Sequence, residues 1–265
     1  MKHSTNALQY VPETLLYTLY MKYRESKRPS GKIQDPRYEE IISKIDYDFS
    51  RFDDISENDS LFQACRTILF DQITRAYIEK NPDAVIVSFG SGLDFRFERL
   101  DNGRIQWFDI ELPEVVELRK KIFQETDRVH SIPVSVLDRS WADCIPLHKN
   151  IFFIAEGLLM YFTPEQVREV FIHLSENFSG STLLLEVYTS RFLEISKLNT
   201  NSFMSNMVDM WQWTPDTWND IEKWDPRIRV IDEWMPMNLF GDREPSFADE
   251  FFQCRIGLVQ LGENK

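Results

Sequence analysis

The chain has 265 residues, 43% of them hydrophobic, which is enough to bury the core of one large α/β domain. Acidic residues outnumber basic ones by 43 to 30, and the net charge of −13 argues against nucleic acid as a partner, because its phosphates would be repelled. The first six residues lack the apolar core of a signal peptide, no run reaches the ~18 apolar residues of a membrane span, and the three cysteines are unclustered. We therefore expect a cytoplasmic protein with no membrane association, no disulfide and no metal site.

Helical and extended patterns alternate along most of the chain. Residues 12–27 and 36–44 predict a helical N-terminal cap, and a longer helix follows over residues 57–80. The alternation beyond residue 80 is typical of an α/β protein with a Rossmann-like, doubly wound and mostly parallel sheet. The predicted strands are 84–88, 105–110, 131–136, 150–155, 181–188, 227–234 and 252–261, and the helices among them are 93–99, 113–125 and 164–177.

Residues 190–224 break this alternation with a polar run rich in methionine and tryptophan. An insertion late in a doubly wound sheet often lies above the carboxyl ends of the strands, where ligands bind. We expect a helical lid there, before the last two strands of a single domain that spans residues 1–265. Whether the lid tryptophans contact substrate or only pack the insertion stays open; they are Trp211, Trp213 and Trp218.

A glycine turn and an acidic strand end predict a nucleoside site. The first strand runs into Gly90-Ser91-Gly92, where glycine allows close approach to a ligand, and the second strand ends at Asp109-Ile110-Glu111. A carboxylate at that strand end can accept hydrogen bonds from both hydroxyls of a ribose. Asp109 follows Gly90 by nineteen residues, near the ~20-residue spacing of a β-α-β unit, which favours this function over a turn of purely geometric origin.

The same region favours S-adenosylmethionine over a dinucleotide. Phe95 stands where a dinucleotide site would have its third glycine, and Asp94 and Glu98 put negative charge where the pyrophosphate would bind. An acid-rich pocket instead attracts a sulfonium. An NAD-dependent oxidoreductase and a non-catalytic nucleoside-binding protein remain as alternatives, whereas the scattered histidines and the context of Ser91 support neither a metalloenzyme nor a hydrolase.

Five strings in chain order then point to a known family. They are Glu13-Thr14-Leu15-Leu16, the segment 90–97, the segment 109–115, the segment 155–162 and Glu222-Lys223-Trp224. Together they resemble the leucine carboxyl methyltransferase family, including its bacterial polyketide-synthesis O-methyltransferase branch. The resemblance implies a class I fold and an S-adenosylmethionine-dependent O-methyltransferase. The chain departs from the family at Phe95, where threonine is common, which leaves the acceptor open.

The resemblance also implies roles for residues at the methionine end of the cofactor. Gly90 and Gly92 would flank the methionine, while Arg66, and less directly Lys22, would bind its carboxylate. Glu156 would lie beside the methionine amine or the sulfonium. Arg66 could instead form a surface ion pair of ~0–1 kcal/mol.

At the nucleoside end, the resemblance implies that Asp109 or Glu111 holds the ribose. Asp138, with Arg139 after it, would face the adenine amino group. Asp138 could instead cap the turn before Trp141.

We expect the acceptor to be a small-molecule carboxylate. A carboxylate is already ionised at pH 7, so the reaction needs positioning, worth ~7–11 kcal/mol in well-oriented cases, more than proton removal. A phenol or alcohol acceptor would need a base, and Tyr161, Glu156 and Tyr188 are the candidates by strand position. The sequence leaves the oligomeric state open.

Overall fold

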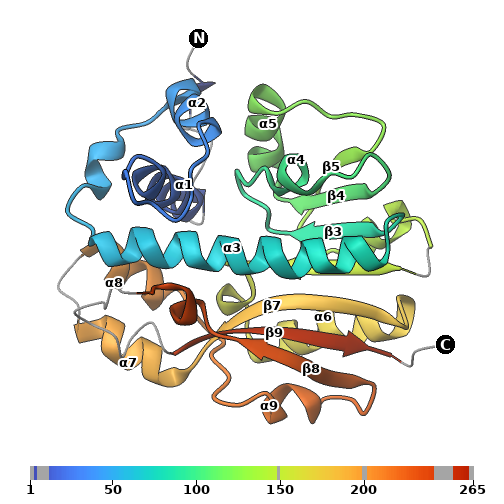
Figure 1. The fold of residues 1–265 in the computed structure, drawn as a ribbon. Coiled ribbons are helices and arrows are strands. Elements are labelled where there is room, and N and C mark those ends of the chain that lie inside the picture. The colour runs from blue at the N-terminus through green and yellow to red at the C-terminus, as the bar shows by residue number, and fades with distance from the viewer. Residues whose placement is uncertain (1–2, 5–11, 148–149, 199–201, 242–252, 263–265) are drawn as a thin grey trace.

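The computed structural model describes residues 3–4, 12–147, 150–198, 202–241 and 253–262, and the statements below concern these residues. Figure 1 shows a twisted sheet with helices packed against it and a group of helices from the N-terminus beside one half of it. Within the described residues, no helix is both long enough and apolar enough to cross a bilayer.

The central sheet has seven strands in the order β5-β4-β3-β6-β7-β9-β8. Neighbouring strands from β5 to β7 run parallel, whereas β9 is antiparallel to both β7 and β8. The strand bounds are β3 Val85–Phe89, β4 Gln106–Glu111, β5 Val129–Pro133, β6 Ile151–Ala155, β7 Ser181–Tyr188, β8 Ile228–Trp234 and β9 Cys254–Leu261. The expected mostly parallel sheet is confirmed, because β9 alone runs against its neighbours.

Alternate residues of the strands pack against helices on opposite faces. Val85 and Val87 join a core cluster with α6 (Pro164–Asn177), whereas Ile86 lies in a cluster with α3 (Glu57–Lys80) and α4 (Arg96–Leu100). Side chains of successive strand residues point to opposite faces, so each apolar strand can bury both of its sides. The sheet is therefore covered on both faces, as the continuous apolar runs predict.

The N-terminal cap packs against α3 rather than joining the large sheet. It consists of α1 (Pro12–Ser26), α2 (Arg37–Lys44) and the short helix η1 (Phe49–Phe52), and a small parallel pair, β1 (His3–Ser4) with β2 (Ile45–Asp46), lies beside them. Its core is a separate cluster of apolar side chains that includes Leu16 and Phe52. In Figure 1, α1 lies directly above the first half of α3.

Several boundaries differ from the expected ones. The third strand, expected at residues 131–136, is β5 at Val129–Pro133, and residues 134–136 form a loop that lines the cavity described below. The helix expected from residue 93 begins at Arg96, because the glycine turn takes up the residues before it, and α5 (Pro113–Ile122) ends before residue 125. Residue 252, the expected start of the last strand, lies outside the described residues.

The insertion before the last two strands is helical. It carries α7 (Ser190–Leu198), α8 (Ser202–Asp209) and α9 (Asn219–Glu222), while residues 199–201 lie outside the described residues. Three short helices lie elsewhere: η2 (Arg139–Cys144), η3 (Leu159–Tyr161) and η4 (Pro236–Leu239). The helical character agrees with the sequence, and opening of the insertion as a lid stays a prediction.

Candidate active site

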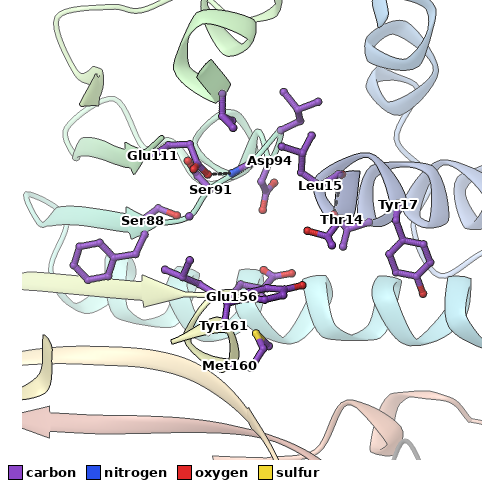
Figure 2. Close-up of a pocket in the computed structure, with 18 of the residues that line it drawn as sticks. Thr14, Leu15, Tyr17, Ser88, Ser91, Asp94, Glu111, Glu156, Met160 and Tyr161 are labelled. Carbon is purple, nitrogen blue, oxygen red and sulfur yellow. Dashed lines mark hydrogen bonds between the residues drawn. The ribbon is translucent and has the colours of Figure 1, made fainter. Parts of the chain in front are cut away.

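A cavity of about 290 Å³ lies at the carboxyl ends of β3, β4 and β6, between these strand ends, α1 and α3. Figure 2 shows Glu111 and Ser88 at one end of it, Glu156 and Asp94 in its middle, and Tyr17 at the other end. The predicted site residues that line it are Lys22, Arg66, Gly90, Gly92, Glu111, Glu156, Tyr161 and Tyr188. The topology thus brings together residues that are far apart in the sequence.

The turn after β3 requires glycine. Gly90 has a φ of +60° and Gly92 a φ of +51°, in the left-handed region that other residues rarely adopt. A Cβ at Gly90 would also come within 2.8 Å of the Leu158 side chain, which is too close for a carbon contact. The turn therefore needs glycine for its own packing as well as for any approach to a ligand.

Glu111 is placed to bind a diol. Its Oε2 accepts a hydrogen bond from the Gly92 amide at 2.8 Å, and its Oε1 accepts one from the Leu112 amide at 2.7 Å. Each oxygen keeps a lone pair, so the carboxylate can accept two hydroxyl hydrogens. Burial raises the pKa of Glu111 above its ordinary value, although both amide hydrogen bonds act in the opposite direction.

The neighbouring Ser91 supports the fit of a polar ligand at this end. Its hydroxyl oxygen is buried at the cavity wall and has no hydrogen-bond partner among the described residues. Buried polar groups are normally paired, so an orphaned one at a cavity wall indicates that a ligand or water completes it. Ser91 and Glu111 together fit the nucleoside half of the cofactor.

Asp109 has a different position from Glu111. It lies two residues deeper in β4, where its carboxylate accepts hydrogen bonds from Trp107 Nε1 at 3.0 Å and from Arg119. It is 3% exposed and is not among the residues that line the cavity. Of the two acids left open by the sequence, the structure therefore favours Glu111 for the ribose and gives Asp109 a structural pairing.

Asp138 and Arg139 also lie away from the cavity. The side chain of Asp138 accepts a hydrogen bond from the Ser140 amide at 3.0 Å and caps η2, and Arg139 is exposed beside Glu169, 3.4 Å away. Their loop does reach the cavity, through Val134, Ser135 and Val136. The alternative capping role of Asp138 is therefore observed, and its contact with the adenine amino group stays a prediction.

Glu156 follows β6 and lies at the centre of a buried charge cluster. It accepts hydrogen bonds from Arg66 Nε at 3.0 Å and from Arg96 Nη2 at 2.6 Å, and Lys22 Nζ lies 3.7 Å away. Burial alone would raise the pKa of Glu156, but the charges of Lys22, Arg96 and Arg66 outweigh it and lower the pKa to about 2. Glu156 is therefore a fixed anion at neutral pH.

Arg66 lies in the cluster and not on the surface. Its Nη1 donates to both carboxylate oxygens of Glu186, at 3.0 and 3.1 Å, and lies 3.4 Å from the Tyr188 hydroxyl. Its Nη2 makes no hydrogen bond to the part of the chain that the structure describes. Nη2 can thus donate to a ligand carboxylate. Lys22 can do the same from beside Glu156, with which it is ion-paired, and burial lowers the pKa of Lys22.

Five members of the cluster are residues that the sequence reasoning did not assign to the site. Arg96 and Arg99 each form ion pairs with Asp71 and Asp94, at 2.6 to 3.1 Å, and Glu186 pairs with Arg66 as described above. Arg96 stands inside the glycine-turn string, which was the signal available for it. The sequence around Asp71 and Glu186 does not predict that they are buried, because an acidic residue on a long helix or in a strand is expected to face solvent.

The other end of the cavity is aromatic. The rings of Tyr188, Phe192 and Trp211 are in mutual contact, with centroids 4.5 to 5.2 Å apart, and all three line the cavity. Figure 2 shows Tyr161 beside Glu156. The Tyr188 hydroxyl lies 3.4 Å from Arg66 Nη1, so this end adjoins the charge cluster. Of the three insertion tryptophans, Trp211 lines the cavity, whereas Trp213 packs against Trp224 in the core and Trp218 lies over Gly257.

The two tyrosines considered as bases are poorly suited to that task. Burial raises the pKa of Tyr161, and it raises the pKa of Tyr188 well above its ordinary value. Both side chains are therefore neutral near pH 7 and can donate a hydrogen bond. The described residues include no group of histidine, cysteine and acidic side chains that could hold a metal ion.

Comparison with known proteins now places this chain. A family model described as leucine carboxyl methyltransferase matches residues 21–175, which is more than half of the chain. A relative from Streptomyces glaucescens, the tetracenomycin polyketide synthesis O-methyltransferase TcmP, is 32% identical over 201 residues, or 73% of each chain. The chain belongs to the leucine carboxyl methyltransferase family. The predicted family is thereby confirmed.

Two more distant proteins agree with this assignment. The S-adenosyl-L-methionine-dependent methyltransferase dpfgK of Gibberella zeae is 24% identical over 256 residues, which is 86% of this chain and 85% of that one. A crystal structure of a DUF574 family protein from Streptomyces avermitilis covers 92% of this chain and 96% of its own, with a TM-score of 0.62 and 11% identity. The latter likeness concerns the fold alone.

The predicted class I fold, the cofactor S-adenosylmethionine and the enzyme class, an S-adenosylmethionine-dependent O-methyltransferase, are therefore confirmed. An NAD-dependent oxidoreductase and a non-catalytic nucleoside-binding protein are not supported.

Proposed function

We propose that this enzyme esterifies a carboxylate of a small molecule. S-adenosylmethionine supplies a sulfonium methyl group, which the acceptor oxygen takes as the carbon–sulfur bond breaks and its electron pair stays on sulfur. The acceptor carboxylate brings its own negative charge, so the chain has to orient the reactants rather than remove a proton.

Different residues of the cavity would bind different parts of the cofactor. Glu111 and the turn at Gly90 and Gly92 would hold the nucleoside and the adjoining part of the cofactor, and Arg66 and Lys22 would bind its carboxylate. Glu156 would stabilise the cationic end of the cofactor as a permanent anion. These assignments rest on the hydrogen-bond directions and charges described above, together with the roles that the family implies.

The observation that carries the proposal is the protonation state of the groups beside the charge cluster. The pKa values of Tyr161 and Tyr188 are raised by burial, and that of Glu156 is lowered to about 2 because the surrounding cations outweigh the effect of burial. A general base works best when its pKa is near the working pH, and none of these three candidates meets that condition. An acceptor that is already ionised fits this set of side chains.

The relative from Streptomyces glaucescens supports a small-molecule acceptor, since its name assigns it to polyketide synthesis. The aromatic end of the cavity supports the same class, because apolar and aromatic walls with a few polar groups are typical of small-molecule sites. A phenol acceptor remains the second candidate, because the carboxylate of Asp59 lines the far end of the cavity and burial raises its pKa.

Methyl transfer to a panel of small carboxylic acids and phenols tests the proposal. With methyl-labelled S-adenosylmethionine, we expect a labelled product that base hydrolyses, as it does an ester. A base-stable ether formed from phenols, with no ester from any acid, would overturn the carboxylate assignment and favour the second candidate.

A further inference from the structure

Gln63 is a buried glutamine in the wall of the cavity. It lies on α3, it is 6% exposed, and it lines the cavity. Its amide oxygen makes no hydrogen bond to any described residue. Leaving such a group unpaired costs ~1–3 kcal/mol, so its retention in the wall of a cavity points to a bound partner.

The position of Gln63 along α3 separates it from the cofactor-binding residues. Asp59, Gln63 and Arg66 are spaced four and three residues apart, so they share one helix face, and all three line the cavity. Gln63 precedes Arg66 by about 4.5 Å along the helix axis, at 1.5 Å per residue. Because Arg66 pairs with Glu156 at the centre of the cavity, Gln63 lies on the side toward Asp59 and the α1 tyrosine Tyr17, which is 3.4 Å from Asp59.

The cavity that Gln63 lines has many aromatic side chains beside its polar ones. They include Tyr17, Phe62, Tyr161 and Trp211. Flat aromatic walls favour an aromatic ligand, since stacked or edge-to-face rings add to the stabilisation from burial. Among these side chains the Gln63 amide oxygen and the Trp211 Nε1 both lack a hydrogen-bond partner in the described part of the chain, and such groups are suited to selecting the position of a polar substituent.

We propose that Gln63 is a specificity-determining residue that hydrogen-bonds a hydroxyl on the acceptor, next to the group that is methylated. The inference rests on the proposed function, and it narrows the substrate class to hydroxylated aromatic carboxylic acids. A hydroxyl both donates and accepts, so it satisfies the amide whichever way its oxygen and nitrogen are oriented. A site built around such a hydrogen bond discriminates strongly against an analogue without the hydroxyl, because the amide is then buried unpaired.

The test compares two probes that differ by one hydroxyl, 3-hydroxy-2-naphthoic acid and 2-naphthoic acid. Their affinities are measured by calorimetry for the full chain loaded with S-adenosylhomocysteine, so that binding is measured independently of turnover. We expect the hydroxy acid to bind about tenfold or more tightly. The variant Gln63→Met keeps the length of the side chain and should abolish this preference by weakening the hydroxy acid alone.

Two further measurements distinguish recognition from a structural role. The melting temperature of Gln63→Met should stay the same or rise, because the substitution removes an unpaired buried amide, and its affinity for S-adenosylmethionine should not change. Gln106→Met, at the exposed start of β4, is the matched control and should retain the preference.

Failure of the inference is distinguishable from failure of the proposed function. Equal affinities for the two acids, binding of neither, or weaker cofactor binding in Gln63→Met would overturn the assignment of Gln63. If the hydroxy acid binds through Gln63 but receives no methyl group on its carboxylate when S-adenosylmethionine is supplied, recognition stands and the carboxylate chemistry fails.

Discussion

The backbone amide of Gly92 donates a 2.8 Å hydrogen bond to Oε2 of Glu111, nineteen residues later in the chain. This bond links the turn after β3 to the end of β4 and fixes the orientation of the carboxylate that would bind the ribose. The turn and the acid therefore depend on each other, and a change in either should lower the affinity for the cofactor.

Glu111→Ala should weaken S-adenosylmethionine binding about tenfold or more, because charged hydrogen bonds contribute about 1.5–3 kcal/mol each. Asp109→Ala should instead lower the stability by about 3–5 kcal/mol, since it leaves the guanidinium of Arg119 buried without its charged partner, with only carbonyl oxygens as acceptors. Calorimetric titration and thermal unfolding of both variants separate the two roles. Wild-type affinity in Glu111→Ala would remove it from the ribose site.

Gly90→Ala should lower both stability and cofactor affinity. The left-handed backbone costs a non-glycine residue about 1–2 kcal/mol, and the new Cβ would meet Leu158. Gly103→Ala is the matched control, with a φ of +79° but no heavy atom within 4 Å of the added Cβ. Equal melting temperatures and equal cofactor affinities for the two variants would show that the close contact at Gly90 is unimportant.

The rate with a carboxylic acid should be constant from about pH 6 to 9, because an ordinary carboxylate is ionised throughout this range. Tyr161→Phe should change the rate without introducing a pH dependence, since the raised pKa keeps the Tyr161 hydroxyl neutral. Initial rates across this range for both proteins are the measurement. A rate that rises with pH in the wild type and loses this rise in Tyr161→Phe would identify Tyr161 as a base.

Glu156 should make the stability of the folded protein fall more steeply as the pH is lowered. Its pKa falls from an ordinary 4.5 to about 2 in the folded protein, because the charges of Lys22, Arg96 and Arg66 outweigh burial, so its stabilisation is complete above pH 4.5 and is lost as the pH falls toward 2. The shift corresponds to about 3 kcal/mol at most. Denaturant unfolding should show the wild type losing its advantage over Glu156→Gln in this window, and a constant difference between the two would contradict the assignment.

Residues of α7 and α8 should exchange amide hydrogens faster than β3 and β6 if the insertion opens as a lid. Adding S-adenosylhomocysteine together with a bound acid should slow exchange in the insertion, because Met207 of α8 and Phe192 of α7 line the cavity. Protection in the free protein as high as that of the strands would mean a static insertion.

The sequence predicts β3 and β6 well because both are continuous apolar runs, closed by Gly90 and Glu156. It misplaces β5, whose residues are half exposed and lack that pattern. It leaves Asp109 and Glu111 equivalent, because residues two apart in a strand point to the same side, and only the depth of each along β4 separates them. The sequence does not predict the position of Gln63 in the cavity wall, since a polar residue in a helix is expected to face solvent unless its spatial neighbours are known.

The charge cluster around Glu156 joins α1, α3, the turn before α4, α4 itself, the end of β6 and β7. Its side chains run from Lys22 to Glu186. Its members can be desolvated together only when all of these segments are present. During synthesis the ribosome produces Lys22 long before Glu186, the last member of the cluster. The charged side chains of the cavity should therefore stay hydrated in the nascent chain until β7 has emerged, and assembly of the cofactor cavity is then a late event in folding.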